Sequence, residues 1–203
     1  MRDLWNRLER WLEQNVPDIL TALNPGASLQ EIEAIQTILG VTLPDDYVAS
    51  CLIHNGQNRE VPSLIPSGMR GSIGGTLLSL GVADDSSFKT VRDEWTMMKQ
   101  IYDTDANIPE GGRLDITVKD RWWIPSWIPI ASDGCGDCDC LDLDPGEGGR
   151  WGQIIAFVHD DYNYRVVQAP SFRAWFEQLV EGLEQGSIVN DEEYGLISTE
   201  ELE

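Results

Sequence analysis

The chain has 203 residues, enough for one domain with a sizeable hydrophobic core. Fourteen Lys and Arg against 35 Asp and Glu give a formal net charge of −21, which disfavours binding to nucleic acid or an anionic membrane and favours a basic partner, unless the charge serves solubility alone. No apolar run approaches the roughly 20 residues that cross a bilayer. The charged N-terminus is unlike a signal peptide, so we expect a cytoplasmic protein with reduced cysteines.

The first elements in chain order are expected to be helices. Residues 3–14 carry Leu and Trp at helical spacing. Ser28 and Glu31 form a capping box that starts a second helix, which Gly40 ends. A third helix begins at "LPDDY", where Asp45 and Asp46 favour the positive end of its dipole.

A loop is expected over residues 57–75, a short strand over 76–80 and a helix over 84–104. The apolar face of this helix is formed by Phe88, Val91, Trp95, Met98 and Tyr102.

Consecutive strands follow, and a helix over residues 171–186 closes the series. The segment "WWIPSWIPIAS" contains Pro125 and Pro129, so it is expected at a sheet edge or through a bend. "DCLDL", "QIIAFVHD" and "YRVVQAP" are expected to pair as a meander, with the second of them buried on both faces. Helices first, antiparallel strands next and a helix last indicate an α+β fold, with helices packed on a central, mostly antiparallel sheet.

Three cysteines lie within six residues, at Cys135, Cys138 and Cys140. With Cys51 and His54, which share one face of the third helix, they could supply ligands for Zn²⁺. However, there is one C-x-x-C knuckle where structural zinc sites usually have two, and Cys138 and Cys140 share one side of a strand as core residues do. We therefore predict no metal and no cofactor.

Two further chemistries were weighed for this region. A nucleophilic Cys135 would need a neighbouring base, and the spacing places neither His54 nor His159 beside it. The aspartates from Asp142 onward depart from a calcium loop, whose sixth position is Gly and whose twelfth is Glu, because here the twelfth is Gln153. No catalytic residue is predicted.

Trp122, Trp123 and Trp127 cluster around prolines beside an expected loop. Their rings either belong to the core, or at least one of them is exposed as an anchor for a partner.

The motifs together resemble the SUKH superfamily. "NPGASLQEIEAIQTILGVTLPDDYVASCLIHNGQ" is similar to its N-terminal signature. "LLSL" with the following Trp-bearing helix, "WIPIASDGCGDCDCLDLDP", "GQIIAFVHD" and "SFRAWFEQLVEGL" match the later blocks in order. The resemblance covers about residues 20–183.

The superfamily includes the yeast Smi/Knr cell-wall regulators and many bacterial immunity proteins that block a toxin, often a nuclease. The resemblance implies an α+β fold with a mostly antiparallel sheet, no known catalysis, and no ligand set matching Cys135 and Cys138. It divides the chain into an N-terminal helical extension (1–19), a SUKH-like domain (20–185) and an acidic tail (186–203) that is partly solvated or disordered.

We therefore expect a non-enzymatic protein-binding domain. The main hypothesis is an immunity protein that binds a basic toxin domain, and the alternative is a scaffold or regulatory module in cell-wall or morphogenesis signalling. The sequence leaves the oligomeric state open. The residues expected to contact the partner are Asp133, Asp137, Trp122, Trp123, Asp45 and Asp46.

Overall fold

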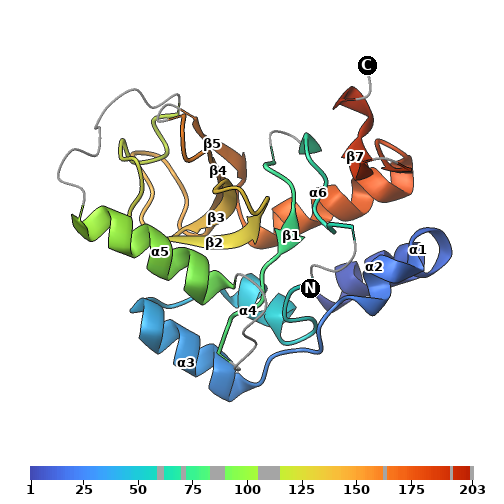
Figure 1. Ribbon diagram of the computed structural model, residues 1–203, viewed down its shortest axis with the longest axis horizontal. Coiled ribbons are helices and arrows are strands. Elements are labelled where there is room, and N and C mark those ends of the chain that lie inside the picture. The colour runs from blue at the N-terminus through green and yellow to red at the C-terminus, as the bar shows by residue number, and fades with distance from the viewer. Residues whose placement is uncertain are drawn as a thin grey trace.

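The computed structural model describes residues 1–58, 62–69, 72–82, 90–104, 115–161, 164–192 and 194–201. Its helices are α1 (Arg2–Asn15), α2 (Pro17–Thr21), α3 (Leu29–Leu39), α4 (Asp45–Cys51), α5 (Val91–Thr104) and α6 (Phe172–Gln185). Its strands are β1 (Thr76–Leu77), β2 (Trp127–Ser132), β3 (Cys138–Asp142), β4 (Gln153–Phe157), β5 (Arg165–Ala169), β6 (Ile188–Asp191) and β7 (Gly195–Ser198). The expected α+β arrangement is confirmed (Figure 1). None of the described helices is both long and apolar enough to span a bilayer.

The central sheet is an antiparallel meander of five strands in the order β1-β2-β3-β4-β5. Both faces of β3 and β4 are buried, as the apolar run in β4 predicted. Because side chains alternate along a strand, Leu141 and Ile154 join a large core on one face, whereas Cys140 and Ile155 join a smaller core on the other.

Pro129 of β2 has the predicted effect, whereas Pro125 lies before the strand. The pairing of β2 with β3 shifts register between Pro129 and Ala131. On its other side β2 pairs with the two-residue strand β1 only at Ala131 and Ser132. Proline lacks the N–H that a ladder needs, and the bulge lets the strand bend around it.

The helical half follows its local sequence signals. The Ser28 hydroxyl accepts from the Glu31 N–H, and the Glu31 carboxylate accepts from the Ser28 N–H, so both halves of the capping box are present. Gly40 ends α3 with φ 68°, a left-handed conformation that glycine adopts at low cost.

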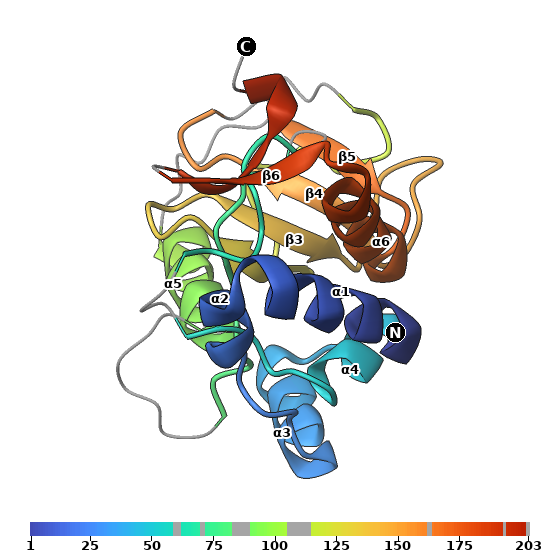
Figure 2. The same ribbon diagram turned by 90° about the vertical axis from the view of Figure 1, so that its right-hand side faces the viewer.

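Helix α1 packs into the main core. Leu4, Trp5, Leu8 and Leu12 are fully buried and belong to the same cluster as the sheet residues. Figure 2 shows α1 between α6 and α4, and it contacts both of these helices. The assignment of residues 1–19 to an extension outside the domain stays a prediction.

Helix α5 lies against β2 (Figure 1). Val91 and Met98 are buried as expected, whereas Tyr102 is 40% exposed and contacts the edge of Trp123. Residues 84–89 of the expected helix, Phe88 among them, lie outside the described residues.

The segment expected to be a partly solvated or disordered tail contains a β-hairpin. β6 and β7 pair antiparallel, and Ile188, Leu196 and Ile197 are buried. Gly195 has φ 74° at the start of β7. The many carboxylates of this segment concealed a short apolar face that packs against α6.

Candidate partner-binding surfaces

The β2–β3 connection is a tight turn. Gly134 and Gly136 have φ 84° and 126°. The Asp133 carboxylate accepts hydrogen bonds from the backbone N–H groups of Cys135, Gly136 and Asp137, with N–O distances of 2.7, 3.2 and 3.1 Å. Asp133 is exposed, but one of its carboxylate oxygens accepts the hydrogen bonds that stabilise the turn.

Asp137 joins this turn to the one between β4 and β5. Its Oδ1 accepts from the His159 backbone N–H at 2.9 Å and lies 2.7 Å from His159 Nδ1. The hydrogen bond that His159 donates to Asp137 raises the pKa of His159, because it favours the imidazolium. The structure thus brings Asp133 and Asp137 together with His159, which the sequence analysis had not connected to them.

A buried arginine, Arg165, stabilises the turn between β4 and β5. The Arg165 guanidinium lies 4.3 Å from the centre of the Phe157 ring. The backbone carbonyls that it contacts belong to Trp122, Val158, Asp161 and Tyr164. Because a guanidinium offers five donors in a fixed plane, one side chain can fix several segments at once.

The tryptophans expected as anchors are core residues. Trp122 is 7% exposed and donates its indole N–H to the His159 carbonyl, while Trp123 and Trp127 are fully buried. Of the two alternatives, burial of these rings in the core is confirmed and exposure of one of them is wrong, since all three pack in the smaller core with Cys138 and its neighbours. Their proposed contact with a partner would require the core to open.

Asp45 and Asp46 lie elsewhere on the molecule. Asp46 accepts from the Arg173 backbone N–H at 2.8 Å, which ties α4 to the start of α6. Helix α6 follows Ala169, which pairs with Ile154 at the opposite end of β4 from Phe157 and the Asp137 turn. The structure therefore does not bring the six predicted contact residues into one surface.

The thiols do not assemble a zinc site. Cys138 and Cys140 face the smaller core, Cys51 lies in the main core, and Cys135 alone is exposed. Burial raises the pKa of Cys51 to about 12 and holds those of Cys138 and Cys140 well above their usual range. Protonated thiols are poor ligands and poor nucleophiles.

Both ring nitrogens of His54 are used away from the thiols. Nδ1 lies 3.0 Å from the Asn24 carbonyl and Nε2 lies 2.8 Å from Glu9 Oε1. His54 therefore joins α1 to the end of α4 rather than completing a ligand set with Cys51.

Among the described residues, the group that could hold a cation consists of Asp137, His159 and Asp160. One ligand-type atom from each lies within 4.8 Å of the others, at the exposed end of the two turns. The Asp137–His159 hydrogen bond already satisfies part of this group, so the geometry is explained without a metal.

Two aspartates of β3 are buried for structural reasons. Asp139 accepts from Ser72 Oγ at 2.6 Å, from the Ile73 N–H at 3.1 Å and from Gln168 Nε2 at 2.6 Å. Burial nevertheless raises the pKa of Asp139 to about 6. Asp142 accepts from the Trp127 indole and from Gln153, so it is not available to calcium.

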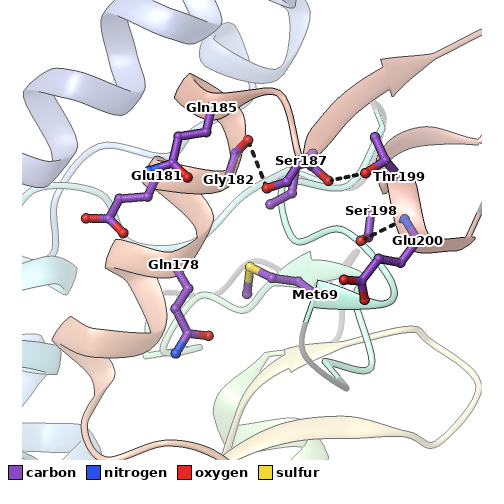
Figure 3. Close-up of a pocket in the computed structure, with 10 residues that line it drawn as sticks. Met69, Gln178, Glu181, Gly182, Gln185, Ser187, Ser198, Thr199 and Glu200 are labelled. Atoms are coloured by element: carbon purple, nitrogen blue, oxygen red, sulfur yellow. Dashed lines mark hydrogen bonds between the residues drawn. The ribbon is translucent and has the colours of Figure 1, made fainter.

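A pocket of about 230 Å³ opens between α6 and the β6–β7 hairpin (Figure 3). Its walls come from residues 178–188, from residues 198–200 and from Met69, which is distant from both in the sequence. The lining residues are Met69, Gln178, Glu181, Gly182, Gln185, Ser187, Ile188, Ser198, Thr199 and Glu200. The sequence analysis missed this pocket because no local motif marks it and because the hairpin that closes it was taken for a solvated tail.

Comparisons with known proteins agree with the resemblance seen in the sequence. Residues 26–178 match the SMI1 / KNR4 family (SUKH-1). The chain is 28% identical over 93% of its length to a cell wall biosynthesis/cell cycle regulator of Schizosaccharomyces pombe, and 28% identical over 93% of its length to a glucan synthesis regulatory protein of Neurospora crassa. It is also 37% identical to human F-box only protein 3, over 33% of this chain and 14% of that protein.

The chain spans 37% and 39% of the lengths of the two fungal relatives. The roles named for the two relatives therefore belong to those longer proteins. Their transfer to this chain is a proposal.

Proposed function

The chain belongs to the SMI1/KNR4 family (SUKH-1), and from that membership we propose that it is a regulatory module that acts by binding other proteins, in the control of cell-wall glucan synthesis or morphogenesis. The single observation that carries the proposal is the family match over residues 26–178. The regulators of Schizosaccharomyces pombe and Neurospora crassa, matched over 93% of the chain, support the same direction.

The geometry supports binding rather than bond-making chemistry. Three of the four thiols are buried with raised pKa values, and Asp139 and Asp142 are enclosed by donors of the fold. The sheet is covered on both faces, so a partner meets the turns, the outer faces of the helices and the pocket beside α6. The formal net charge of −21 steers a basic partner toward the chain.

The immunity-protein hypothesis remains a second prediction of the sequence. The net charge is the observation that favours it, because nuclease toxins hold phosphates and have basic active sites. The named fungal relatives favour regulation instead.

A segment exchange tests the regulatory proposal. In the Schizosaccharomyces pombe regulator, this chain replaces the matching segment, and the chimera is expressed in cells that lack the natural protein. We expect the chimera to restore resistance of the cells to glucanase digestion, measured as the rate of lysis, because the module would supply the missing binding surface.

The control is the same chimera carrying Gly56→Ala, because a Cβ at this position would clash with the Ser79 backbone and destabilise the fold. The proposal is contradicted if the unmodified chimera accumulates to the natural level and the cells still lyse as fast as cells without it.

A further inference from the structure

The pocket between α6 and the hairpin has an excess of hydrogen-bond acceptors. Glu181 lines it from α6 and Glu200 lines it from the segment after β7. Figure 3 shows Met69 between Gln178 on the helix and Glu200 on the opposite wall. Among the described residues, neither Glu181 nor Glu200 has a basic side chain within ion-pair distance of its carboxylate.

An amide oxygen adds to this excess. The Oε1 atom of Gln178 is buried and accepts no hydrogen bond from the described residues. The Nε2 atom of the same amide donates to the Gln168 carbonyl at 3.5 Å. Since a buried acceptor without a donor destabilises the protein, a donor that entered the pocket beside Gln178 would gain from meeting it.

The end of α6 makes the pocket more negative. Helix α6 ends at Gln185 with Gly186 at φ 75°, and its last turn has no basic residue. The negative end of a helix dipole favours a cation, yet α6 has Glu181 and Glu184 in its second half and Glu177 before them. Arg7 pairs with Glu184 at 2.6 Å, but this leaves Glu181 without a direct partner among the described residues.

We propose that this pocket binds an arginine side chain of a protein partner. Three features of the pocket favour a cation, namely the two carboxylates, the negative helix end and the unsatisfied amide oxygen. A guanidinium suits them better than an ammonium, because its planar fork can meet a carboxylate with two N–H groups and still donate to an amide. The inference rests on the proposed protein-binding function and names the chemistry of its partner.

A titration followed by NMR tests the proposal on the full chain. The probe is Nα-acetyl-arginine N-methylamide, and the matched probe is the citrulline analogue, which has the same length and no charge. We expect saturable shifts of the Gly182, Ser187 and Thr199 amides with the arginine probe and none with the citrulline probe. Equal shifts with both probes, or saturable shifts confined to other parts of the chain, overturn the proposal.

Charge variants separate the pocket from the general negative field. The double variant E181Q/E200Q should weaken binding of the arginine probe at least fivefold. The control E13Q/E147Q removes the same number of carboxylates from exposed positions outside the lining, and its affinity should stay within twofold of that of the natural chain. An equal loss in both variants would mean unspecific attraction.

A third variant gives the pocket a cation of its own. Gln185→Lys places an ammonium in the last turn of α6, where it should compete with the probe and weaken binding at least fivefold. Unchanged affinity in Gln185→Lys overturns the proposal, because the probe would then bind away from the helix end.

Failure of this inference can be told apart from failure of the proposed function. If the segment exchange fails while the probe still binds the pocket, the cell-wall role alone is overturned. If the exchange succeeds and the probe does not bind, the arginine site alone is overturned.

Discussion

Single residues fix the junction between the helices and the sheet. The Asn24 N–H donates to the Gly56 carbonyl at 3.0 Å, and the Asn55 N–H donates to the Pro25 carbonyl at 3.2 Å. The Asn55 side chain accepts from the Leu80 N–H at 3.0 Å. The "NPG" and "HNG" motifs of the sequence thus face each other, and their resemblance to a family signature has a structural cause in this contact.

Gly56→Ala should destabilise the protein by about 3 kcal/mol. Gly56 has φ 73°, and a Cβ at this position would lie 2.3 Å from the Ser79 backbone nitrogen, so strain and a backbone clash add together. The measurement is the midpoint of urea unfolding.

Gly148→Ala is the control for Gly56→Ala. Gly148 has φ 79° and open space around its Cβ position, so conformational strain alone should lower the free energy of unfolding by about 1 kcal/mol. If the two variants lose the same stability, close packing at the junction is not the reason for Gly56.

At the scale of elements, the sheet carries a polar network on the face of its main core. Asp139 of β3 is linked to Gln168 of β5, and Gln168 Oε1 accepts from the Trp175 indole of α6 at 3.0 Å. Ser72 and Ile73 connect the segment before β1 to the same carboxylate. This network therefore joins strands, a helix and a loop through one titratable group.

Asp139→Asn should change how stability depends on pH. The pKa of Asp139 rises from 3.8 to about 6 in the folded protein. Because the folded protein holds this proton more tightly than the unfolded chain does, the protonated carboxyl stabilises the fold. This contribution is fully present below pH 3.8 and is lost as the pH rises through about 6. A shift of about two units corresponds to about 3 kcal/mol.

The measurement compares urea unfolding of the natural chain and of Asp139→Asn at pH 4 and pH 7. Asn does not titrate, so between these two pH values the natural chain should lose about 2.4 kcal/mol relative to the variant, most of the full effect. Taking the difference cancels the other carboxyls, which both proteins share. A difference that stays constant with pH would show that the Asp139 carboxyl titrates as it does in the unfolded chain.

Elements with strong local signals were predictable from the sequence. The capping box of Ser28 and Glu31 and the bulge at Pro129 each follow from residues close in the chain. The sequence left open whether Trp122 and Trp123 are buried, because the side of a chain segment that faces the core is set by distant residues. The pocket beside α6 was missed for the same reason, since Met69 and Glu200 meet only in the folded molecule.

At the scale of the whole molecule, two cores enclose the sheet. The larger core contains residues from α1, α3, α4 and α6, and the smaller one contains Met98 of α5 with Trp122, Trp123 and Trp127. The family match begins at residue 26, yet the larger core begins with Leu4. The larger core therefore includes the first helix, whereas the family match does not cover it.

Removal of residues 1–19 tests whether the first helix is part of the domain or an extension of it. Leu4, Trp5, Leu8 and Leu12 are fully buried, and the Trp5 indole donates to Ser50 Oγ at 2.9 Å. Burial of four such side chains contributes about 8 kcal/mol, which is of the same order as the whole stability of a domain. Residues 20–203 should therefore lose a cooperative urea transition and NMR dispersion.

The control truncation removes residues 199–203, whose described 3₁₀ turn has no buried residue, and it should unfold cooperatively like the natural chain. If residues 20–203 also unfold cooperatively with an unchanged midpoint, α1 is a detachable extension as the sequence predicted. A lost transition instead makes α1 part of the domain, because the face that it covers on α4 and α6 is apolar and would be exposed to water without it.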